Sequence, residues 1–210
     1  MRRPLVIAAL MALACALRAG APGTEIDPAS SDWRPLLAAL AARPAVAAPF
    51  TERRYFPFRR DPVELRGMLR ISRERGLSLQ YTGPAPSVVV ADQAGILLRD
   101  ADGRTRSLAA GSREAGSLSS LLPILRFDLP ALSPRFEIRG QRTGDGWFLV
   151  FVPRDPALAD SLGEIRVSGA GTEVRRLEFR RSAAQRIEIE VGAAQVGPAF
   201  TPDDLRRFFR

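Results

Sequence analysis

The 210-residue chain contains no histidine, no lysine and no asparagine, and its single cysteine, Cys15, lies near the N-terminus. The absence of histidine excludes Ser-His-Asp and Cys-His catalysis, histidine-ligated zinc or haem, and a histidine pH switch. With Cys15 alone, the chain forms no internal disulfide and holds no iron–sulfur cluster. All 31 basic residues are arginine. Because this bias is typical of a GC-rich genome, the arginine content alone indicates no function.

The N-terminal segment has the three parts of a secretory signal, which are a basic end, an apolar run and a small-x-small cleavage site. Arg2 and Arg3 supply the basic end, residues 5–17 are apolar without interruption, and residues 19–21 read Ala-Gly-Ala. As a helix the apolar run extends about 20 Å, which is too short for a bilayer core that takes roughly 20 residues. We therefore expect residues 1–21 to be a cleavable signal peptide.

Two other interpretations of this segment concern the route and the product of export. The twin arginines stand at the extreme terminus without the rest of the twin-arginine motif, which favours the ordinary secretory route. Residues 12–15, Ala-Leu-Ala-Cys, resemble a lipidation box, but the large aliphatic residue is one position out of place and the apolar run continues past Cys15. We expect an exported, unacylated protein that begins near Pro22, with acylation of Cys15 as the alternative.

The composition of the remaining chain is that of a globular protein. Hydrophobic residues make up 46% of the sequence and charged residues 26%, which excludes a disordered or collagen-like chain. The length and the absence of an internal repeat predict a single domain over residues 22–210. Removal of the three leader arginines lowers the formal charge from +8 to +5. Since many arginines stand beside acids and no basic stripe carries interleaved aromatics, we expect no nucleic-acid partner.

Most of this domain is predicted to be β-sheet. Alternating or continuous apolar residues predict strands around residues 64–72, 77–81, 88–90, 96–99, 136–138, 147–152, 165–167, 174–179 and 187–191. Helices are predicted from a cap at Ser31 or Asp32 to Leu40, over residues 155–162, and from Thr201 onward.

One segment breaks the strand pattern in the middle of the chain. Leu118, Leu121, Leu122 and Leu125 have helical spacing, and Pro123 keeps that helix short. A short apolar helix within a β-rich chain needs an apolar surface to cover. We therefore expect the helix at residues 117–126 to lie over a groove.

The sequence carries no motif of a known catalytic site. It has no phosphate loop, dinucleotide fingerprint, GxSxG elbow or zinc-ligand spacing. Asp92, Asp128 and Asp160 offer carboxylates for a glycosidase-type pair, but each stands at the end of a predicted strand or helix, where a turn residue is expected. We therefore expect a protein that is not an enzyme, with no catalytic residue, no metal and no cofactor.

Arg73 stands at the end of an apolar stripe. Counted by twos, it continues the strand face that carries Leu69 and Ile71. The simpler interpretation is an arginine at a strand end that extends over its own methylenes to solvent. The alternative is a guanidinium at a partly buried sheet edge, whose five donors hold the carbonyls of a covering helix. Spacing alone favours the simpler interpretation.

Several segments, taken in order, carry a family pattern. They are Phe50-Thr51-Glu52, Gly-Met-Leu-Arg-Ile-Ser-Arg at 67–73, Leu-Ser-Leu-Gln-Tyr at 77–81, Pro84, Val-Val-Val-Ala-Asp at 88–92, and Trp-Phe-Leu-Val-Phe-Val-Pro at 147–153. This ordered set resembles the periplasmic outer-membrane lipoprotein carrier family, the Lol-type (LolA-like) carriers, over about residues 33–191. Two positions depart from the family pattern: Glu52 replaces a glutamine, and Glu74 replaces the proline that usually follows the arginine.

The resemblance implies a mainly β (α+β) fold, an incomplete antiparallel β-barrel of about ten to eleven strands with a helical lid over its concave apolar face. It also implies that Arg73 is the lid latch, which bonds to lid carbonyls when the carrier is empty. The lid would present Leu118, Leu121, Leu122 and Leu125. The lipid-binding groove would be lined by Leu69, Ile71, Leu77, Leu79, Tyr81, Val88, Val90, Ile96, Leu98, Phe136, Ile138, Trp147, Leu149 and Phe151, which would otherwise form an ordinary sandwich core.

The resemblance implies the function of a monomeric carrier in the periplasm of a Gram-negative cell. Such a carrier shields the acyl chains of lipoproteins, or a related lipid cargo, and delivers them toward the outer membrane. By resemblance, its partners are the inner-membrane lipoprotein-releasing transporter and an outer-membrane receptor. Two alternatives remain: a periplasmic lipid sensor or scaffold of the same fold, and an outer-membrane lipoprotein receptor acylated at Cys15.

Overall fold

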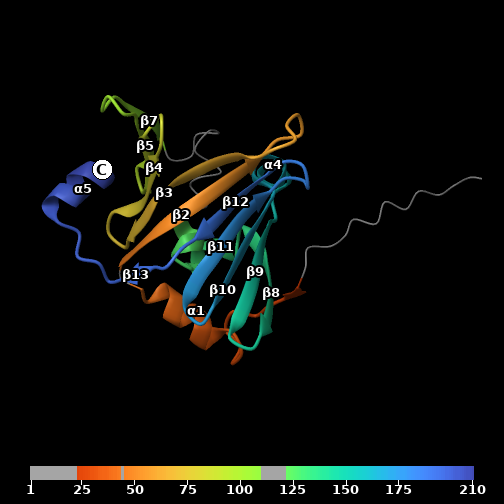
Figure 1. The fold of residues 1–210 in the computed structure, drawn as a ribbon. Helices are drawn as coiled ribbons and strands as arrows, with labels where there is room; N and C mark the ends of the chain where they lie inside the picture. The colour runs from red at the N-terminus through yellow and green to blue at the C-terminus, as the bar shows by residue number, and fades with distance from the viewer. Residues whose placement is uncertain (1–22, 44, 110–121) are drawn as a thin grey trace, which may run out of the picture.

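In the computed structural model, one large antiparallel sheet curves around an apolar interior (Figure 1). The structure describes residues 23–43, 45–109 and 122–210. Their strands are β1 (Thr24–Glu25), β2 (Ala45–Tyr55), β3 (Val63–Ser72), β4 (Gly76–Thr82), β5 (Ser87–Asp92), β6 (Gly95–Arg99), β7 (Thr105–Ala109), β8 (Phe136–Thr143), β9 (Gly146–Pro153), β10 (Glu164–Ala170), β11 (Glu173–Arg180), β12 (Arg186–Val191) and β13 (Gln195–Val196).

The sheet is an incomplete barrel, as predicted. Its strand order is β1-β8-β9-β10-β11-β12-β2-β3-β4-β5-β6-β7, with β13 also paired to β2. The two ends of this order, β1 and β7, are not joined, so the sheet stays open on one side. The described residues form thirteen strands rather than ten or eleven, and the difference comes from β1 and β13, which have two residues each.

The helices of the described residues are α1 (Arg34–Ala41), α3 (Leu129–Leu132), α4 (Pro156–Leu162) and α5 (Pro202–Phe208), and residues 122–125 form a further helical turn. The predicted helices at 155–162 and from Thr201 are both present. Asp155 caps α4 by accepting a hydrogen bond from the Leu158 amide at 2.9 Å, and Thr201 forms a capping box with Asp204. None of the helices in these ranges is long and apolar enough to cross a membrane.

The predicted cap of α1 is wrong. Neither Ser31 nor Asp32 caps this helix, because Trp33 is the N-cap residue and no side chain caps it. The backbone amides of Trp33 and Arg34 instead donate to the carbonyl of Ser30, at 3.3 and 2.9 Å. A backbone turn therefore replaces the side-chain cap, and Pro35 occupies the first helical turn as expected.

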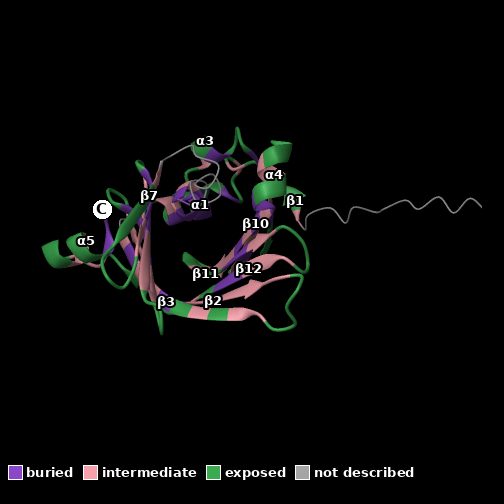
Figure 2. Cartoon of the chain, turned by 90° about the horizontal axis from the view of Figure 1, so that it is seen from above, coloured by how far each residue is buried: buried purple, intermediate pink, exposed green. Residues whose placement is uncertain are grey.

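α1 lies at the open side of the curved sheet and packs its apolar face into the concave interior (Figure 2). Trp33, Leu37 and Leu40 are each no more than 8% exposed and belong to the main core. The Trp33 ring reaches β8 at Gly140, where a Cβ atom would lie 2.6 Å from the ring. The missing side chain at this position therefore makes room for the helix.

A second, smaller apolar cluster lies on the outer face of the sheet under α5. Phe208 and Phe209 are buried there, and the Arg99 guanidinium donates to the Arg207 carbonyl at 2.6 Å. The Arg70 guanidinium lies 3.6 Å above the Phe208 ring, a cation–π contact. The C-terminal helix thus covers the side of β3–β6 that faces away from the main core.

Candidate functional site

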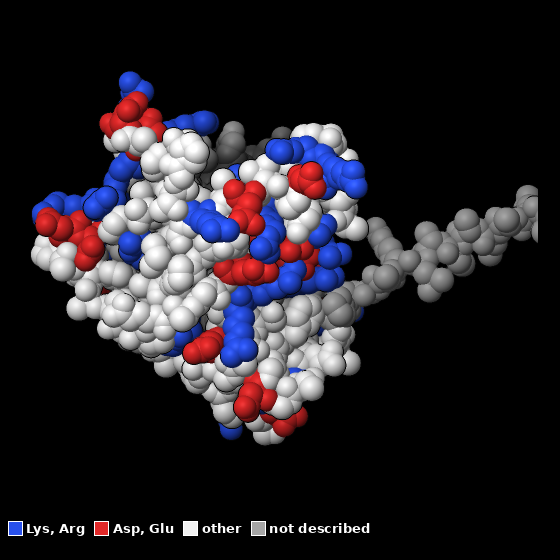
Figure 3. All heavy atoms as spheres, viewed as in Figure 1, with Lys and Arg blue, Asp and Glu red and all other residues white. Residues whose placement is uncertain are grey.

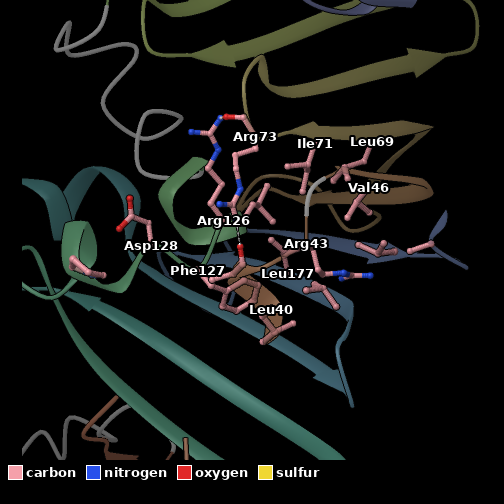
Figure 4. A pocket seen from close by; sticks show the side chains of 16 residues that line it. Leu40, Arg43, Val46, Leu69, Ile71, Arg73, Arg126, Phe127, Asp128 and Leu177 are labelled. Carbon is pink, nitrogen blue, oxygen red and sulfur yellow. Dashed lines mark hydrogen bonds between the residues drawn. The ribbon is translucent and has the colours of Figure 1, made fainter. Parts of the chain in front are cut away.

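A cavity of about 380 Å³ opens between α1, the sheet and the segment that follows the helical turn at 122–125 (Figure 4). This volume is within the 300–1,000 Å³ range typical of small-molecule sites. Its lining residues are Leu40, Ala41, Arg43, Val46, Leu69, Ile71, Arg73, Leu125, Arg126, Phe127, Asp128, Pro130, Val174, Leu177, Val191 and Ala194.

Strand register brings the apolar wall of the cavity together. Val46 of β2 is paired with Ile71 of β3, so their side chains share the concave face. Leu69 is on the same face of β3 because it is two residues from Ile71. Leu177 of β11 and Val191 of β12 extend this wall across the sheet. The result is an apolar surface made of strands from both halves of the chain.

Most of the predicted groove residues do lie together on the concave face, but they do not line the cavity. Leu69, Leu77, Leu79, Ile96, Phe136, Ile138, Trp147, Leu149 and Phe151 belong to one buried core, and Ile71, Tyr81 and Leu98 pack against it. Only Leu69 and Ile71 of this set also line the cavity. The remainder of the concave face is filled in this structure by the protein's own side chains.

The prediction that Val88 and Val90 face the groove is wrong. Val90 is paired with Ser78, and Val88 with Gln80, whereas Leu77 on the concave face is paired with Ala91. The side chains of Val88 and Val90 therefore point to the outer face, the face that α5 covers. Val89 is the β5 residue that packs against the main core.

The material that fills the concave face comes from two segments, α1 and residues 122–132, which we call the cover. Of the predicted lid residues, Leu122 and Leu125 are buried in the main core, while Leu118 and Leu121 lie outside the described residues. The cover also contains residues that the sequence analysis did not assign to it: Trp33, Leu36, Leu37, Leu40, Ile124, Phe127 and Leu132. The helical period of residues 33–40 predicts an apolar face for α1, but not that this face docks on the concave side of the sheet.

Phe127 turns the chain sharply within the cover. Its φ angle is 52°, which lies in the left-handed region that a bulky residue rarely occupies. Such a conformation costs on the order of 1–3 kcal/mol and persists where surrounding contacts stabilise it. Here the buried Phe127 ring packs edge-on against Trp147, with ring centres 5.9 Å apart.

Arg73 donates a hydrogen bond to the carbonyl of Ala41, the last residue of α1. The contact is of the type expected from a latch, since a charged donor holds a helix carbonyl, but the helix is α1. In the described part of the chain, Arg73 forms no ion pair with Glu74. Its guanidinium is therefore available to the cover and the cavity.

Arg126 makes the reciprocal contact and was not identified from the sequence. It follows the helical turn at 122–125, and its Nη2 donates to the carbonyls of Ser72 and Arg73 at 3.1 and 2.6 Å. Burial lowers the pKa of Arg126, and the positive charge of Arg73 lowers it further, with Asp128 acting in the opposite direction. Two arginines therefore connect the cover to the end of β3 while repelling each other.

Arg43 lies in the connection between α1 and β2 and lines the same cavity. Burial lowers its pKa, and only the nearby Glu173 opposes that effect. Its Nη2 atom is buried without a hydrogen-bond partner, as is the Nε atom of Arg126. In Figure 4, Arg73 and Arg126 lie together on one side of the cavity and Arg43 lies apart from them.

Glu52 is the most buried carboxylate of the described residues, at 2% exposure. It accepts hydrogen bonds from the Tyr81 hydroxyl at 2.7 Å and from the Arg54 guanidinium. Burial, and next the negative charge of Glu52, raise the pKa of Tyr81. The Glu-for-Gln departure thus introduces a buried charge whose partners are present on the same face.

The three aspartates considered for catalysis occupy ends or turns. Asp92 accepts from the Ala94 amide in the β5–β6 turn and pairs with Arg210 at 2.7 Å. Asp128 caps α3 by accepting from the Ala131 amide, and Asp160 lies in α4. Each of these positions is explained by local structure, and the described residues contain no group of three or more acids or cysteines placed to hold a metal.

Comparison with known proteins relates most of the chain to one family. A family model described as outer membrane lipoprotein carrier protein LolA-like matches residues 26–208. A comparison with curated protein sequences finds no match.

Three solved structures illustrate what the chain is similar to. A LolA superfamily protein from Nitrosomonas europaea has 8% identity and a TM-score of 0.46, covering 82% of this chain and 96% of its own. A domain described as outer membrane lipoprotein-sorting, from Vibrio parahaemolyticus, has 10% identity and a TM-score of 0.46, covering 83% and 94%. MucB has 16% identity and a TM-score of 0.45, covering 84% and 63%.

Proposed function

The chain belongs to the outer membrane lipoprotein carrier LolA-like family, and from this premise we propose that it is a periplasmic carrier of acyl chains. In this proposal, residues 1–21 are a cleaved signal peptide and residues 22–210 form one carrier domain. The domain shields the acyl chains of a lipoprotein, or of a related lipid, and delivers them toward the outer membrane. It receives cargo from an inner-membrane lipoprotein-releasing transporter and passes it to an outer-membrane receptor.

The observation that supports this proposal is an apolar cavity between a half-barrel and a cover. Val46, Leu69 and Ile71 give the cavity an aliphatic wall on the sheet side. Each methylene removed from water is worth about 0.8 kcal/mol, so multiple acyl chains need such a wall to cross an aqueous compartment. The cavity alone is small, and displacement of the cover exposes the rest of the predicted groove.

Closure of the cover is the step that competes with cargo. Arg73 holds the end of α1, and Arg126 holds the 122–126 segment against the end of β3. Cargo binds by displacing this cover, so the free energy of closure is subtracted from the affinity for acyl chains. In the proposed mechanism these two arginines are the latch that keeps net affinity low enough for release.

Binding and transfer of a triacylated fluorescent lipopeptide test this function. The protein is secreted with its own leader, purified without detergent and titrated with the lipopeptide, and then added between donor vesicles that hold the probe and empty acceptor vesicles. We expect saturable binding, and transfer that is faster in proportion to protein concentration. No binding would refute the lipid proposal, and binding without faster transfer would replace the carrier by the sensor or scaffold.

A matched pair of variants locates the binding surface. Ile71→Gln places an amide in the cavity wall, and Met68→Gln places the same group on the outer face of the same strand. Both side chains are half-buried, so the two variants disturb folding similarly. We expect Ile71→Gln to weaken lipopeptide binding about tenfold and Met68→Gln to leave it within twofold. Equal effects would place the acyl chains elsewhere.

A further inference from the structure

The charges around the cavity are unbalanced. Arg43, Arg73 and Arg126 line it, while Asp128 is the one acid among the lining residues that the structure describes. The carboxylate of Asp128 is engaged in capping α3. Within the described ranges, none of the three arginines forms an ion pair. The cavity is therefore an apolar space with excess positive charge at its edge.

Two of these three arginines have a nitrogen atom without a hydrogen-bond partner. The Nη2 of Arg43 and the Nε of Arg126 are buried and have no hydrogen-bond partner. Buried polar atoms of native proteins are nearly always hydrogen-bonded, and each exception needs an explanation. Leaving a charged group's donor unpaired costs more than leaving a neutral one unpaired. An acceptor supplied by a bound molecule would remove this cost at each of these atoms that it reaches.

The repulsion between Arg73 and Arg126 points to the charge of that molecule. The two guanidinium groups are close enough for the charge of Arg73 to lower the pKa of Arg126. An anion placed beside them would reduce this repulsion, whereas a neutral group would leave it unchanged. Guanidinium groups also bind phosphate and carboxylate oxygens in pairs of parallel hydrogen bonds.

We propose that the cavity selects acyl lipids with an anionic head group, which binds at the edge formed by Arg73 and Arg126, while Arg43 supplies a third positive charge. The acyl chain lies on the wall of Val46, Leu69 and Ile71, which joins this edge directly. This inference rests on the proposed function and narrows its substrate class, since a head group and an acyl chain together match the two parts of the cavity. A free anion would use only the arginines and leave the apolar wall exposed.

The test compares two soluble lipids with identical chains. Dioctanoyl phosphatidic acid and dioctanoylglycerol, each below its micelle concentration, are titrated against the detergent-free protein, with inorganic phosphate as the anion without chains. The readout is the ratio of the two lipid affinities, because a change in cover opening alters both affinities alike and cancels. We expect a preference of at least tenfold for the phosphatidic acid, decreasing as the salt concentration rises.

Three variants assign the preference to the cavity. Arg43→Gln and Arg126→Gln should each lower the affinity ratio at least threefold, and Arg126→Lys should lower it less than Arg126→Gln because it keeps the charge. Arg104→Gln removes an arginine from the β6–β7 hairpin, where the side chain is 80% exposed and outside the cavity, and should leave the ratio unchanged. A single cooperative thermal unfolding transition confirms that each variant is folded.

Each other outcome overturns the inference in a distinguishable way. If both lipids bind the wild type equally, head-group selection is refuted while the acyl-carrier proposal stands. If neither lipid binds, the proposed function fails together with the inference. If inorganic phosphate binds as tightly as phosphatidic acid, the arginines form a free-anion site. A ratio that Arg43→Gln and Arg126→Gln leave unchanged would place the head group away from these side chains.

Discussion

The arginines on the outer face of the sheet and those at the cavity have opposite surroundings. On the outer face acidic and basic side chains gather together over β2, β11 and β12 (Figure 3). Arg53 contacts both Glu64 and Glu190 there, at 3.3 and 2.9 Å, and Arg180 contacts Glu178 at 2.6 Å. At the cavity, Arg73 and Arg126 donate to backbone carbonyls, and Arg43 has a buried unpaired donor.

This difference separates two uses of the same residue. On the strands an arginine commonly stands two residues from a glutamate, as in Glu64–Arg66, Glu137–Arg139, Glu164–Arg166 and Glu178–Arg180. Side chains two apart share a strand face, so this spacing neutralises charge locally. At the cavity, Arg43 and Arg73 have no acid two residues away, and the Asp128 carboxylate, two residues from Arg126, caps α3 instead of pairing with that arginine. The charge of these arginines therefore remains available to a ligand. Pairing with carboxylates, rather than arginine content, thus distinguishes the site from the surface.

The largest expected effect comes from removing the latch. The double variant Arg73→Gln/Arg126→Gln loses charged donors to the carbonyls of Ala41, Ser72 and Arg73. A hydrogen bond from a charged donor contributes about 1.5–3 kcal/mol. We therefore expect dioctanoylglycerol to bind at least about tenfold more tightly. This lipid has no charged head group, so removing the arginines costs it no head-group contact. Equilibrium titration measures this, and an affinity equal to that of the wild type would refute the latch.

A smaller effect, on the ratio of the two lipid affinities, should follow from placing a glutamate two residues from a cavity arginine, as on the outer face. Ile71→Glu would place a carboxylate two residues before Arg73, on the same face of β3. By pairing with that arginine, it should cancel the preference for phosphatidic acid over dioctanoylglycerol. Ile71→Gln has the same shape without the charge and is the control. If the Glu and Gln variants keep the same affinity ratio, charge at Arg73 does not select the head group.

Breaking an outer pair should have little effect on binding. Arg66→Gln removes a partner of Glu64 in a pair whose side chains are 73% and 39% exposed. Exposed pairs usually contribute about 0–1 kcal/mol to stability, so we expect the free energy of unfolding to fall by no more than this. Denaturation in urea measures the loss, and titration with both lipids should give the wild-type affinity ratio. A changed ratio would mean that the outer face takes part in lipid selection, and the contrast between the two regions would disappear.

The smallest effect concerns Tyr81 at alkaline pH. Because burial and Glu52 raise its pKa in the folded protein, the unfolded state releases the phenolic proton first. The stabilising contribution is therefore present below the ordinary tyrosine pKa of about 10 and is lost as the pH rises above it. Urea denaturation between pH 8 and pH 11 should show a steeper loss of stability for the wild type than for Tyr81→Phe. Parallel curves would contradict this assignment.

Alternation correctly predicted which residues lie on the concave face of the sheet where polar residues separate the apolar ones. In β3 and β4, Arg70, Ser78 and Gln80 mark the opposite face, so Leu69, Leu77 and Leu79 are placed unambiguously. In β5 the run from Val88 to Ala91 is apolar on both faces because α5 covers the outer one. No local pattern distinguishes the two faces of such a strand, and the prediction for Val88 and Val90 therefore failed.

The cavity itself could be predicted only in part. The position of Arg73 at the end of an apolar stripe identified it as a candidate site residue. Arg126 follows a short helical turn, and no periodic pattern in the sequence identifies it. Its role depends on the turn at Phe127 and on a contact with β3, more than fifty residues earlier in the chain. The contribution of α1 to the cover likewise depends on where the helix docks, which its amphipathic pattern does not specify.

Mass spectrometry under non-denaturing conditions tests the central claim most directly. The protein is secreted with its leader into a Gram-negative periplasm, purified without detergent, and measured intact and after organic extraction. We predict an acyl lipid with a phosphate or carboxylate head group bound to the wild type, and a lower bound fraction in Ile71→Gln than in Met68→Gln. A wild-type protein that carries no lipid, and that takes up none from added dioctanoyl phosphatidic acid or lipopeptide, would contradict the account.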